Sequence, residues 1–307
     1  MIFSCGAQEF TARDVLDWAQ AQGELAPLWS NFLRAGECER VALERELEAD
    51  GDAISEASVA FRYAHDLITA EETERWLEAR GLTLQDFGEY FERQHWFGLL
   101  RDDVAAPEGQ FLSASAEEQE EFVAEITLSG QLDRLAEQLS FRVAAQAEEG
   151  GDQSAFERQR QNAITEKSLE RELQGMRLNL TRFELEAIEV DSHDAAAEVI
   201  ACVKSDGMQM EEVAEESRYP FRRSELLLED MPADRQQTFL SVRGGTLLEP
   251  LAREDGFEVC RVKSRVDPEL SDSRIRERLA NEITRRHFAA LVSKHIAWKL
   301  SQAAKDE

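Results

Sequence analysis

The sequence predicts an α+β protein in which a mostly helical N-terminal lobe precedes a small α/β unit and a long C-terminal helix. Capping residues and glycine stops divide the first half into amphipathic helical segments. Near residue 178 the apolar spacing changes to the alternation of a strand. After Pro268, one helical pattern covers most of the remaining chain, with Ile275, Leu279 and Ile283 on one face.

The helical lobe is predicted from its start and stop signals. Gly23 is expected to end the first helix, Gly51 to end the helix "RVALERELEADGD", and Gly81 to separate two further helices. In a capping pair, a Thr side chain and an acidic side chain three residues later satisfy free N–H groups of the first turn. The pairs are Thr11 with Asp14, Thr69 with Glu72, and Thr83 with Asp86.

Aromatic residues recur on roughly one face of the helix after Gly81. Such a stripe is typical of a buried core or of a lobe interface, and a peptide-binding groove is the alternative. The residues are Phe87, Tyr90, Phe91 and Phe97.

Residues 178–265 are predicted to form a small unit of order β-α-α-α-β-β. Its first strand alternates apolar and acidic residues through Phe183, Leu185 and Ala187. Pro232 is expected in the first turn of the third helix, and the pair 255–256, Asp-Gly, predicts a hairpin between the last two strands.

These patterns suggest four segments. Residues 1–106 form the helical lobe, 107–176 add further helices and a connector, 177–267 form the α/β unit, and 268–307 form the terminal helix. This last helix has an apolar stripe and a basic face. We therefore expect it to pack on the acidic N-terminal lobe and not on the α/β unit.

The charge balance restricts the possible partners. The chain has 63 Asp and Glu against 35 Lys and Arg, and a formal charge of −28. Nucleic acids and anionic membranes are therefore not expected partners, because both attract clustered positive charge. Such acidity is typical of a highly soluble protein or of one adapted to salt. The alternative is that the negative charge attracts basic peptides.

The sequence also predicts no membrane insertion, metal site or cofactor. It has no apolar run of about 18 residues, and its start does not resemble a signal peptide, which predicts a cytoplasmic location. The four cysteines form no C-x-x-C pair, and His287 and His295 lie too far apart to hold a metal alone. No phosphate-binding or hydrolase motif occurs.

The α/β unit resembles the parvulin-type peptidyl-prolyl isomerase domain. The matching stretches are "DAAAEVIACVKSDG", "MQMEEVAEES" and "MPADRQQTFLSVRGGTLLEPLAREDGFEVCRV", which together span roughly 90 residues with the preceding strand. With "TAEETERWLEARGLTLQDF" upstream and a helix downstream, the layout resembles the SurA- and PrsA-type foldases. The resemblance implies a chaperone-like lobe, binding of unfolded polypeptide, and in the SurA type a terminal helix that returns to that lobe.

The resemblance implies that the catalytic floor is replaced. The positions of the family's two histidines fall near Ala187 and on Glu258, and a Cys or Asp position falls near Tyr219. Glu258 beside Arg253 and Arg235 is expected to form a charged floor. This charged floor has two alternative interpretations: an ordinary surface ion pair, or a cleft that binds a peptide backbone or a charged side chain.

The walls of the expected cleft are preserved only in part. Met231 matches a family methionine, and Leu226 and Phe221 are candidate wall residues. Arg235 stands near the position of a family Phe, and Arg253 near that of a Thr. The resemblance therefore implies a peptide-binding site without an assigned catalytic residue.

We accordingly expect a foldase-type protein that binds extended or unfolded polypeptide, with isomerase activity weak or lost. Isomerisation requires an enzyme to bind the twisted prolyl amide better than the planar one, and that depends on a shaped apolar cup. The alternatives are an active isomerase with a histidine-free site, and an accessory factor that holds a precursor peptide for a maturation or export system. The sequence leaves the oligomeric state open.

Overall fold

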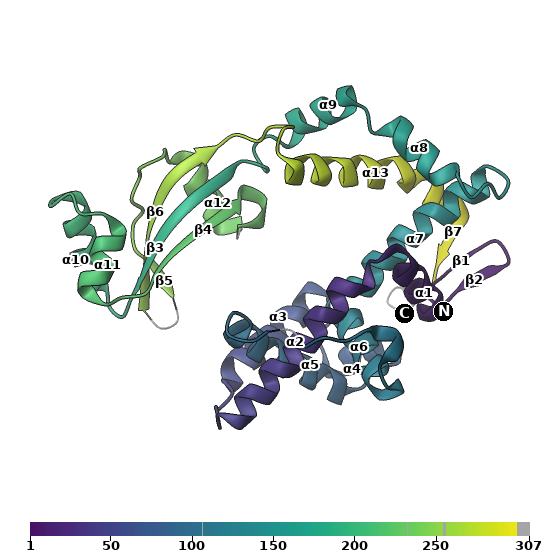
Figure 1. Ribbon diagram of the computed structural model, residues 1–307, viewed down its shortest axis with the longest axis horizontal. Coiled ribbons are helices and arrows are strands. Elements are labelled where there is room, and N and C mark those ends of the chain that lie inside the picture. Colours follow the sequence, from purple (N-terminus) through teal and green to yellow (C-terminus); the bar gives the residue numbers. More distant parts are fainter. Residues whose placement is uncertain (106, 232, 254–255, 300–307) are drawn as a thin grey trace. The chain divides into compact units, whose positions relative to one another are not determined.

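The computed structural model describes residues 1–307 except 106, 232, 254–255 and 300–307 (Figure 1). The chain is an α+β protein, as predicted, and it divides into two compact units. Unit 1 is Met1–Gln159 with His287–Glu307, and unit 2 is Arg160–Arg286. The predicted boundaries of the four segments remain a prediction, because this division is coarser.

Unit 1 is a helical bundle with a small sheet. The helix α8 begins in unit 1 and ends in unit 2. The elements are β1 (Phe3–Cys5), β2 (Gln8–Phe10), α1 (Ala12–Gln22), α2 (Leu25–Glu44), α3 (Gly51–Ala64), α4 (Ala70–Glu78), α5 (Leu84–Leu100), η1 (Phe111–Ser113), α6 (Ala116–Leu128), α7 (Gln131–Glu148) and α8 (Ala155–Ala163).

The three predicted capping boxes are present at the starts of α1, α4 and α5, and Gly23 ends α1 in the left-handed conformation. The role predicted for Gly51 is wrong. Gly51 begins α3 and does not end a helix, because the Asp50 side chain accepts hydrogen bonds from the next free backbone N–H groups.

The aromatic stripe of α5 forms core. Phe87 and Phe91 are buried in one cluster with Leu77 and Leu82, and Phe61 packs against them at ring distances of 5.5 and 5.7 Å. The buried rings of this stripe are therefore core, and they do not form an open groove.

The N-terminal hairpin was not predicted from the sequence. β1 pairs with β2 and also with β7 (Ile296–Trp298), which gives the sheet order β2-β1-β7. Phe3 is fully buried and stacks on Phe10 at 4.6 Å. Strands of three residues are too short to show a period in the sequence.

Unit 2 contains a four-stranded antiparallel sheet of order β4-β3-β6-β5. Its strand β4 is absent from the predicted order β-α-α-α-β-β, which is therefore corrected. The polar run "RRSE" in β4 hid the alternation of an edge strand. The elements are α9 (Glu166–Met176), β3 (Arg182–Val190), α10 (His193–Lys204), α11 (Met210–Ser217), β4 (Phe221–Leu227), η2 (Leu228–Asp230), α12 (Ala233–Ser241), β5 (Leu251–Arg253) and β6 (Gly256–Val266).

Each side of this sheet carries its own apolar core. α10 and α11 cover one side, where Ile188 and Val259 are fully buried, and α12 lies on the other, where Phe183 and Val262 are fully buried (Figure 1). The predicted β5–β6 hairpin is present through the pairing of Leu251–Arg253 with Gly256–Glu258. The positions predicted for Pro232 and Asp255 lie outside the described residues.

The long helix α13 (Ser273–His295) contributes to both units. Ile275 and Leu279 are buried in unit 2 with Leu169 and Leu180, and Phe288 is fully buried in unit 1. The structure differs here from the expectation that this helix avoids the α/β unit. The cause is that its first turns bury their apolar face on α9, on Leu180 just before β3, and on Leu227 of β4.

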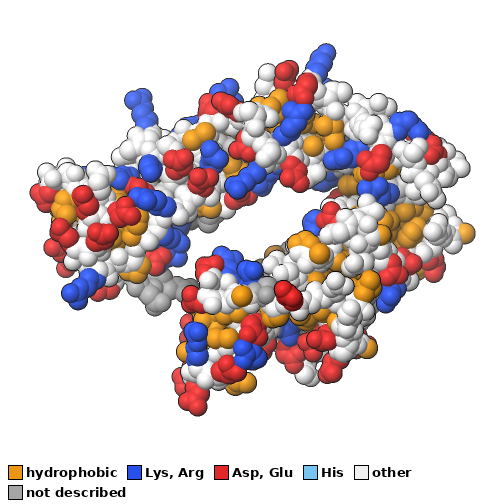
Figure 2. All heavy atoms as spheres, in the orientation of Figure 1, with side chains coloured by type: hydrophobic (Ala, Val, Ile, Leu, Met, Phe, Trp, Pro, Cys, Tyr) orange, Lys and Arg blue, Asp and Glu red, His pale blue; other side chains and the backbone are white. Residues whose placement is uncertain are grey.

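Among the described residues, no helix is both long and apolar enough to cross a membrane. On the face drawn in Figure 2, acidic and basic side chains are interspersed over both units.

The burial of Phe288 predicts how strongly α13 stabilises unit 1. We expect Phe288→Ala to lower the free energy of unfolding by about 3–5 kcal/mol, because a fully buried ring is removed from contact with Phe141 and Phe156. Denaturant unfolding of unit 1 measures the loss. Arg285→Ala is the control, because this side chain is 61% exposed and, among the residues that the structure describes, forms an ion pair only with the neighbouring Glu282. A loss at Phe288 no larger than that of the control contradicts the prediction.

Candidate functional site

The candidate site lies on the side of the unit 2 sheet that faces α12. Strand alternation places Leu185, Ala187 and Glu189 of β3 on this side, and Leu185 joins the apolar core under α12. Beyond that core the surface becomes charged. Ala187 lies opposite Arg222 on β4 and Cys260 on β6.

Four charged residues from four strands meet at this point, and we call them the charged cluster. Adjacent strands bring them together, because Glu189 is opposite Glu258 and Arg253 closes the β5–β6 hairpin. The members are Glu189 of β3, Arg222 of β4, Arg253 of β5 and Glu258 of β6.

Glu258 is the buried member of the charged cluster. Its side chain is 7% exposed, and Arg222 and Arg253 both donate hydrogen bonds to its Oε2, Arg253 over 2.8 Å. Arg253 also donates to Glu189 over 2.7 Å. The two carboxylates and two guanidinium groups balance one another, which is the condition for keeping a buried carboxylate charged.

The expected partnership of Glu258 with Arg253 is therefore present, and a second partner, Arg222, was missed. Sequence reasoning missed Arg222 because it did not recognise β4, which places Arg222 opposite Ala187. It missed Glu189 because the register of β3 with β6, which places Glu189 opposite Glu258, is not visible in the sequence. The sequence signal for β4 is Phe221, an apolar residue at the start of this otherwise polar edge strand.

Arg235 lies beside the charged cluster but does not join it. It lines a pocket of about 530 Å³ with Glu189, Arg253 and Phe257. Within the described part of the chain, Arg235 makes no ion pair with Glu258, so it does not contribute to the charged floor expected from the sequence. Its charge instead acts on the Cys260 thiol, where it opposes the larger rise in pKa that burial and Glu258 cause.

Cys260 lies beside Glu258 at the buried end of the site. Burial raises the pKa of its thiol to about 12, and the charge of Glu258 adds to this effect. The residue is 2% exposed, and its thiol stays protonated at neutral pH. Cys260 is therefore a packing residue and not a nucleophile.

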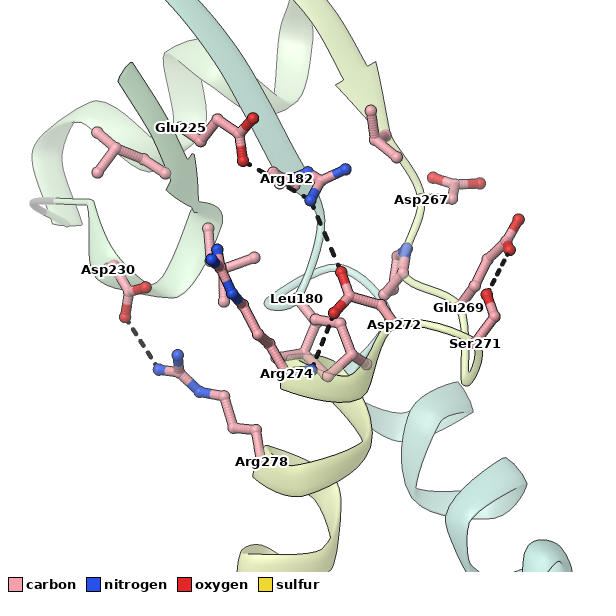
Figure 3. Close-up of a pocket in the computed structure, with 15 residues that line it drawn as sticks. Leu180, Arg182, Glu225, Asp230, Asp267, Glu269, Ser271, Asp272, Arg274 and Arg278 are labelled. Carbon is pink, nitrogen blue, oxygen red and sulfur yellow. Dashed lines mark hydrogen bonds and ion pairs between the residues drawn. The ribbon is translucent and has the colours of Figure 1, made fainter.

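The other predicted residues lie elsewhere. Tyr219 and Phe221 pack on the opposite side of the sheet, against the α10–α11 core. Met231 is 5% exposed in the core under α12, and Leu226 is 38% exposed in a second pocket at the other end of β4 (Figure 3). The structure thus gathers Ala187, Arg253 and Glu258, with Arg235 beside them. The peptide-binding role of all these residues remains a prediction.

The charged cluster offers ionic recognition and no evident acid–base chemistry. It contains no histidine, and the ring of the exposed His193 on α10 contacts Phe257 at 5.5 Å between centroids. In the described ranges no group of three or more His, Cys, Asp or Glu side chains is placed to hold a metal ion.

Comparison with known proteins finds similarity to solved structures. No family model and no curated protein matches the chain. Similar solved structures are PrsA/SurA-like foldases. The foldase protein PrsA of Streptococcus pneumoniae is 12% identical, with 99% of this chain and 93% of that chain covered and a TM-score of 0.30.

Two further structures are equally distant. PrsA of Bacillus subtilis is 13% identical, with 93% of this chain and 89% of that chain covered and a TM-score of 0.25. A SurA-like chaperone of Campylobacter jejuni is 10% identical, with 65% of this chain and 87% of that chain covered and a TM-score of 0.26. At these scores the likeness carries no argument about the site or the function.

The state of Cys260 is testable by alkylation. We expect iodoacetamide at pH 8 to label the partly exposed Cys202 and to leave Cys260 unlabelled until the protein unfolds. Mass spectrometry of the labelled peptides, with and without denaturant, measures the labelling of each cysteine. Labelling of Cys260 as fast as Cys202 in the folded protein contradicts this assignment.

Proposed function

We propose that unit 2 is a parvulin-like domain that binds an extended segment of unfolded polypeptide, with peptidyl-prolyl isomerase activity weak or lost. The protein then acts as a foldase-type chaperone. Sequence motifs support this proposal, because the parvulin-like stretches fall on α10, α11, α12 and the β5–β6 hairpin around one sheet. A cytoplasmic location remains part of the proposal.

The pairing of Glu258 is the observation that carries the proposal. The resemblance implies a histidine at this position, and the buried carboxylate is instead held by Arg222 and Arg253. A carboxylate fixed by two guanidinium groups provides neither a neutral hydrogen-bond donor nor an apolar surface for a proline ring. The site therefore lacks the features that stabilise a twisted amide over a planar one.

The same geometry suits an extended chain. Arg222 and Arg253 remain 51% and 42% exposed, so part of each guanidinium group faces solvent. Such groups donate several hydrogen bonds in fixed directions and are suited to peptide carbonyl and carboxylate oxygens. The proposed ligand is a polypeptide that offers these acceptors beside the buried Ala187.

Weak or absent isomerase activity is the first expected outcome. In a protease-coupled assay with Xaa-Pro peptides, we expect a catalytic efficiency at least about tenfold below that of an ordinary parvulin, because the site does not favour the twisted amide. An ordinary parvulin assayed beside it is the positive control. An efficiency within tenfold of that control favours the alternative of an active, histidine-free isomerase.

Binding of unfolded polypeptide is the second expected outcome. Fluorescence anisotropy with a labelled, permanently unfolded protein should show binding that Arg253→Glu weakens at least about fivefold, because a hydrogen-bond donor is replaced by a repelling charge. Arg243→Glu makes the same charge change at an exposed residue outside the cluster and should preserve binding. Equal affinity of both variants excludes the charged cluster as the binding site.

The structure also determines which substitutions are informative. Met231 is buried in the core with Phe239, so Met231→Asp tests folding and not ligand contact. Arg253 is half exposed, and its replacement leaves Arg222 to hold Glu258. Thermal unfolding of each variant confirms that a loss of binding is not a loss of fold.

A further inference from the structure

The second pocket of unit 2 lies at the other end of the sheet from the charged cluster. Along β3, Phe183 is opposite Leu226, and Glu189 is opposite Glu258, a separation of about 20 Å for six strand residues. The pocket has a volume of about 540 Å³ and lies between the ends of β4 and β6 and the first turns of α13 (Figure 3). It is therefore a separate site.

The pocket has an apolar lining that includes a partly exposed leucine. Leu180 and Ile275 are buried, whereas Leu226 is 38% exposed. The pocket volume of about 540 Å³ leaves room for one or two large apolar side chains. The apolar lining residues are Leu180, Leu226, Leu227, Val266, Pro268 and Ile275.

Carboxylates outnumber guanidinium groups around the pocket. Arg182 lies between Glu225 and Asp272, at 3.7 and 3.6 Å. Arg278 likewise faces two carboxylates, Glu229 at 2.6 Å and Asp230 at 2.9 Å. The acidic residues are Glu225, Glu229, Asp230, Asp267, Glu269 and Asp272, and the basic residues are Arg177, Arg182, Arg265, Arg274 and Arg278.

These pairs leave an excess of negative charge at the rim. Figure 3 shows Arg182 and Arg278 each directed at carboxylates, while Glu269 is bonded to the neutral Ser271 over 3.0 Å. The whole chain, including these residues, carries a formal charge of −28. The rim therefore attracts cationic groups and repels acidic ones.

β4 adds a backbone surface to this pocket. It is an outer strand of the sheet and pairs only with β3, so its other edge presents N–H and C=O groups without a strand partner among the described residues. Such an edge accepts an extended peptide as an additional strand. Glu225, Leu226 and Leu227, the last residues of this strand, also line the pocket.

We propose that the β4 edge and this pocket dock an extended polypeptide in which an apolar side chain is flanked by lysine or arginine. The apolar side chain enters the pocket, and basic residues two positions away on the same strand face meet the acidic rim. The inference rests on the proposed polypeptide binding, but it names a second contact site and the sequence preference of the ligand.

The ligand preference is tested with the full chain and three fluorescein-labelled peptides. One carries Lys-Ser-Leu-Ser-Lys, the second replaces lysine with glutamate, and the third replaces leucine with serine. We expect the first to bind at least about tenfold more tightly than either of the others, because only it satisfies both rim and lining. Equal binding of the first and third shows non-specific attraction to an acidic protein and overturns the inference.

Substitutions test where on the molecule the first peptide binds. Leu226→Arg and Glu225→Lys should each weaken binding of the first peptide about tenfold, since one removes apolar surface and the other reverses a rim charge. Glu216→Lys is the matched control, because it makes the same charge change on an exposed residue of α11. Equal losses in Glu225→Lys and Glu216→Lys, or unchanged binding in Leu226→Arg, overturn the pocket assignment.

The strand pairing has its own test. Two versions of the first peptide carry N-methyl groups on alternate backbone nitrogens, so that only one version blocks the hydrogen bonds directed at β4. We expect one version to lose binding and the other to retain it, and equal binding of both overturns the edge assignment. If the wild-type chain binds unfolded protein but not the first peptide, only this inference fails. If it binds neither, the proposed function fails as well.

Discussion

Unit 2 depends on the pairing of β3 with β6, because this pair supplies buried residues to both sides of the sheet. Ile188 and Val259 are fully buried under α10 and α11, and Phe183 and Val262 are fully buried on the side of α12. With a period of two, a slip of one residue would exchange these sets and place Glu258 in the opposite apolar core. The register that forms the cores therefore also fixes the position of the candidate site.

Buried carboxylates follow the same register on both sides of the sheet. Glu186 is 4% exposed and receives a hydrogen bond from Arg261 over 2.9 Å, while Glu258 is held by Arg222 and Arg253 on the opposite side. Arg261 and Arg253 each come from the strand next to that of their carboxylate, whereas Arg222 of β4 reaches Glu258 of β6 across β3. Removal of all the partners of such a carboxylate would leave its charge uncompensated in a dry environment, so these pairs help to specify which strands belong together. Glu258 at the candidate site therefore has a structural role that is independent of any ligand.

The helix α13 has a related dual role. Its first turns bury Ile275 and Leu279 in unit 2, and its last turns bury Phe288 in unit 1. The helix then continues directly into the strand β7, which pairs with β1. The same first turns form one wall of the pocket at the end of β4. The packing that orders this part of the helix thus also creates the apolar surface proposed to receive a client side chain.

The sequence by itself determined the local features of this protein. The caps at Thr11, Thr69 and Thr83, the β5–β6 hairpin and the α+β class depend on residues close together in the chain, whose interactions require no distant partner. Only the tertiary structure decided that β4 forms an edge strand, that Arg222 holds Glu258, and that Leu226 lies far from the charged cluster. Those features depend on pairing between strands distant in the sequence. The free energy that selects the pairing comes from burial on both sides of the sheet, which no single segment displays.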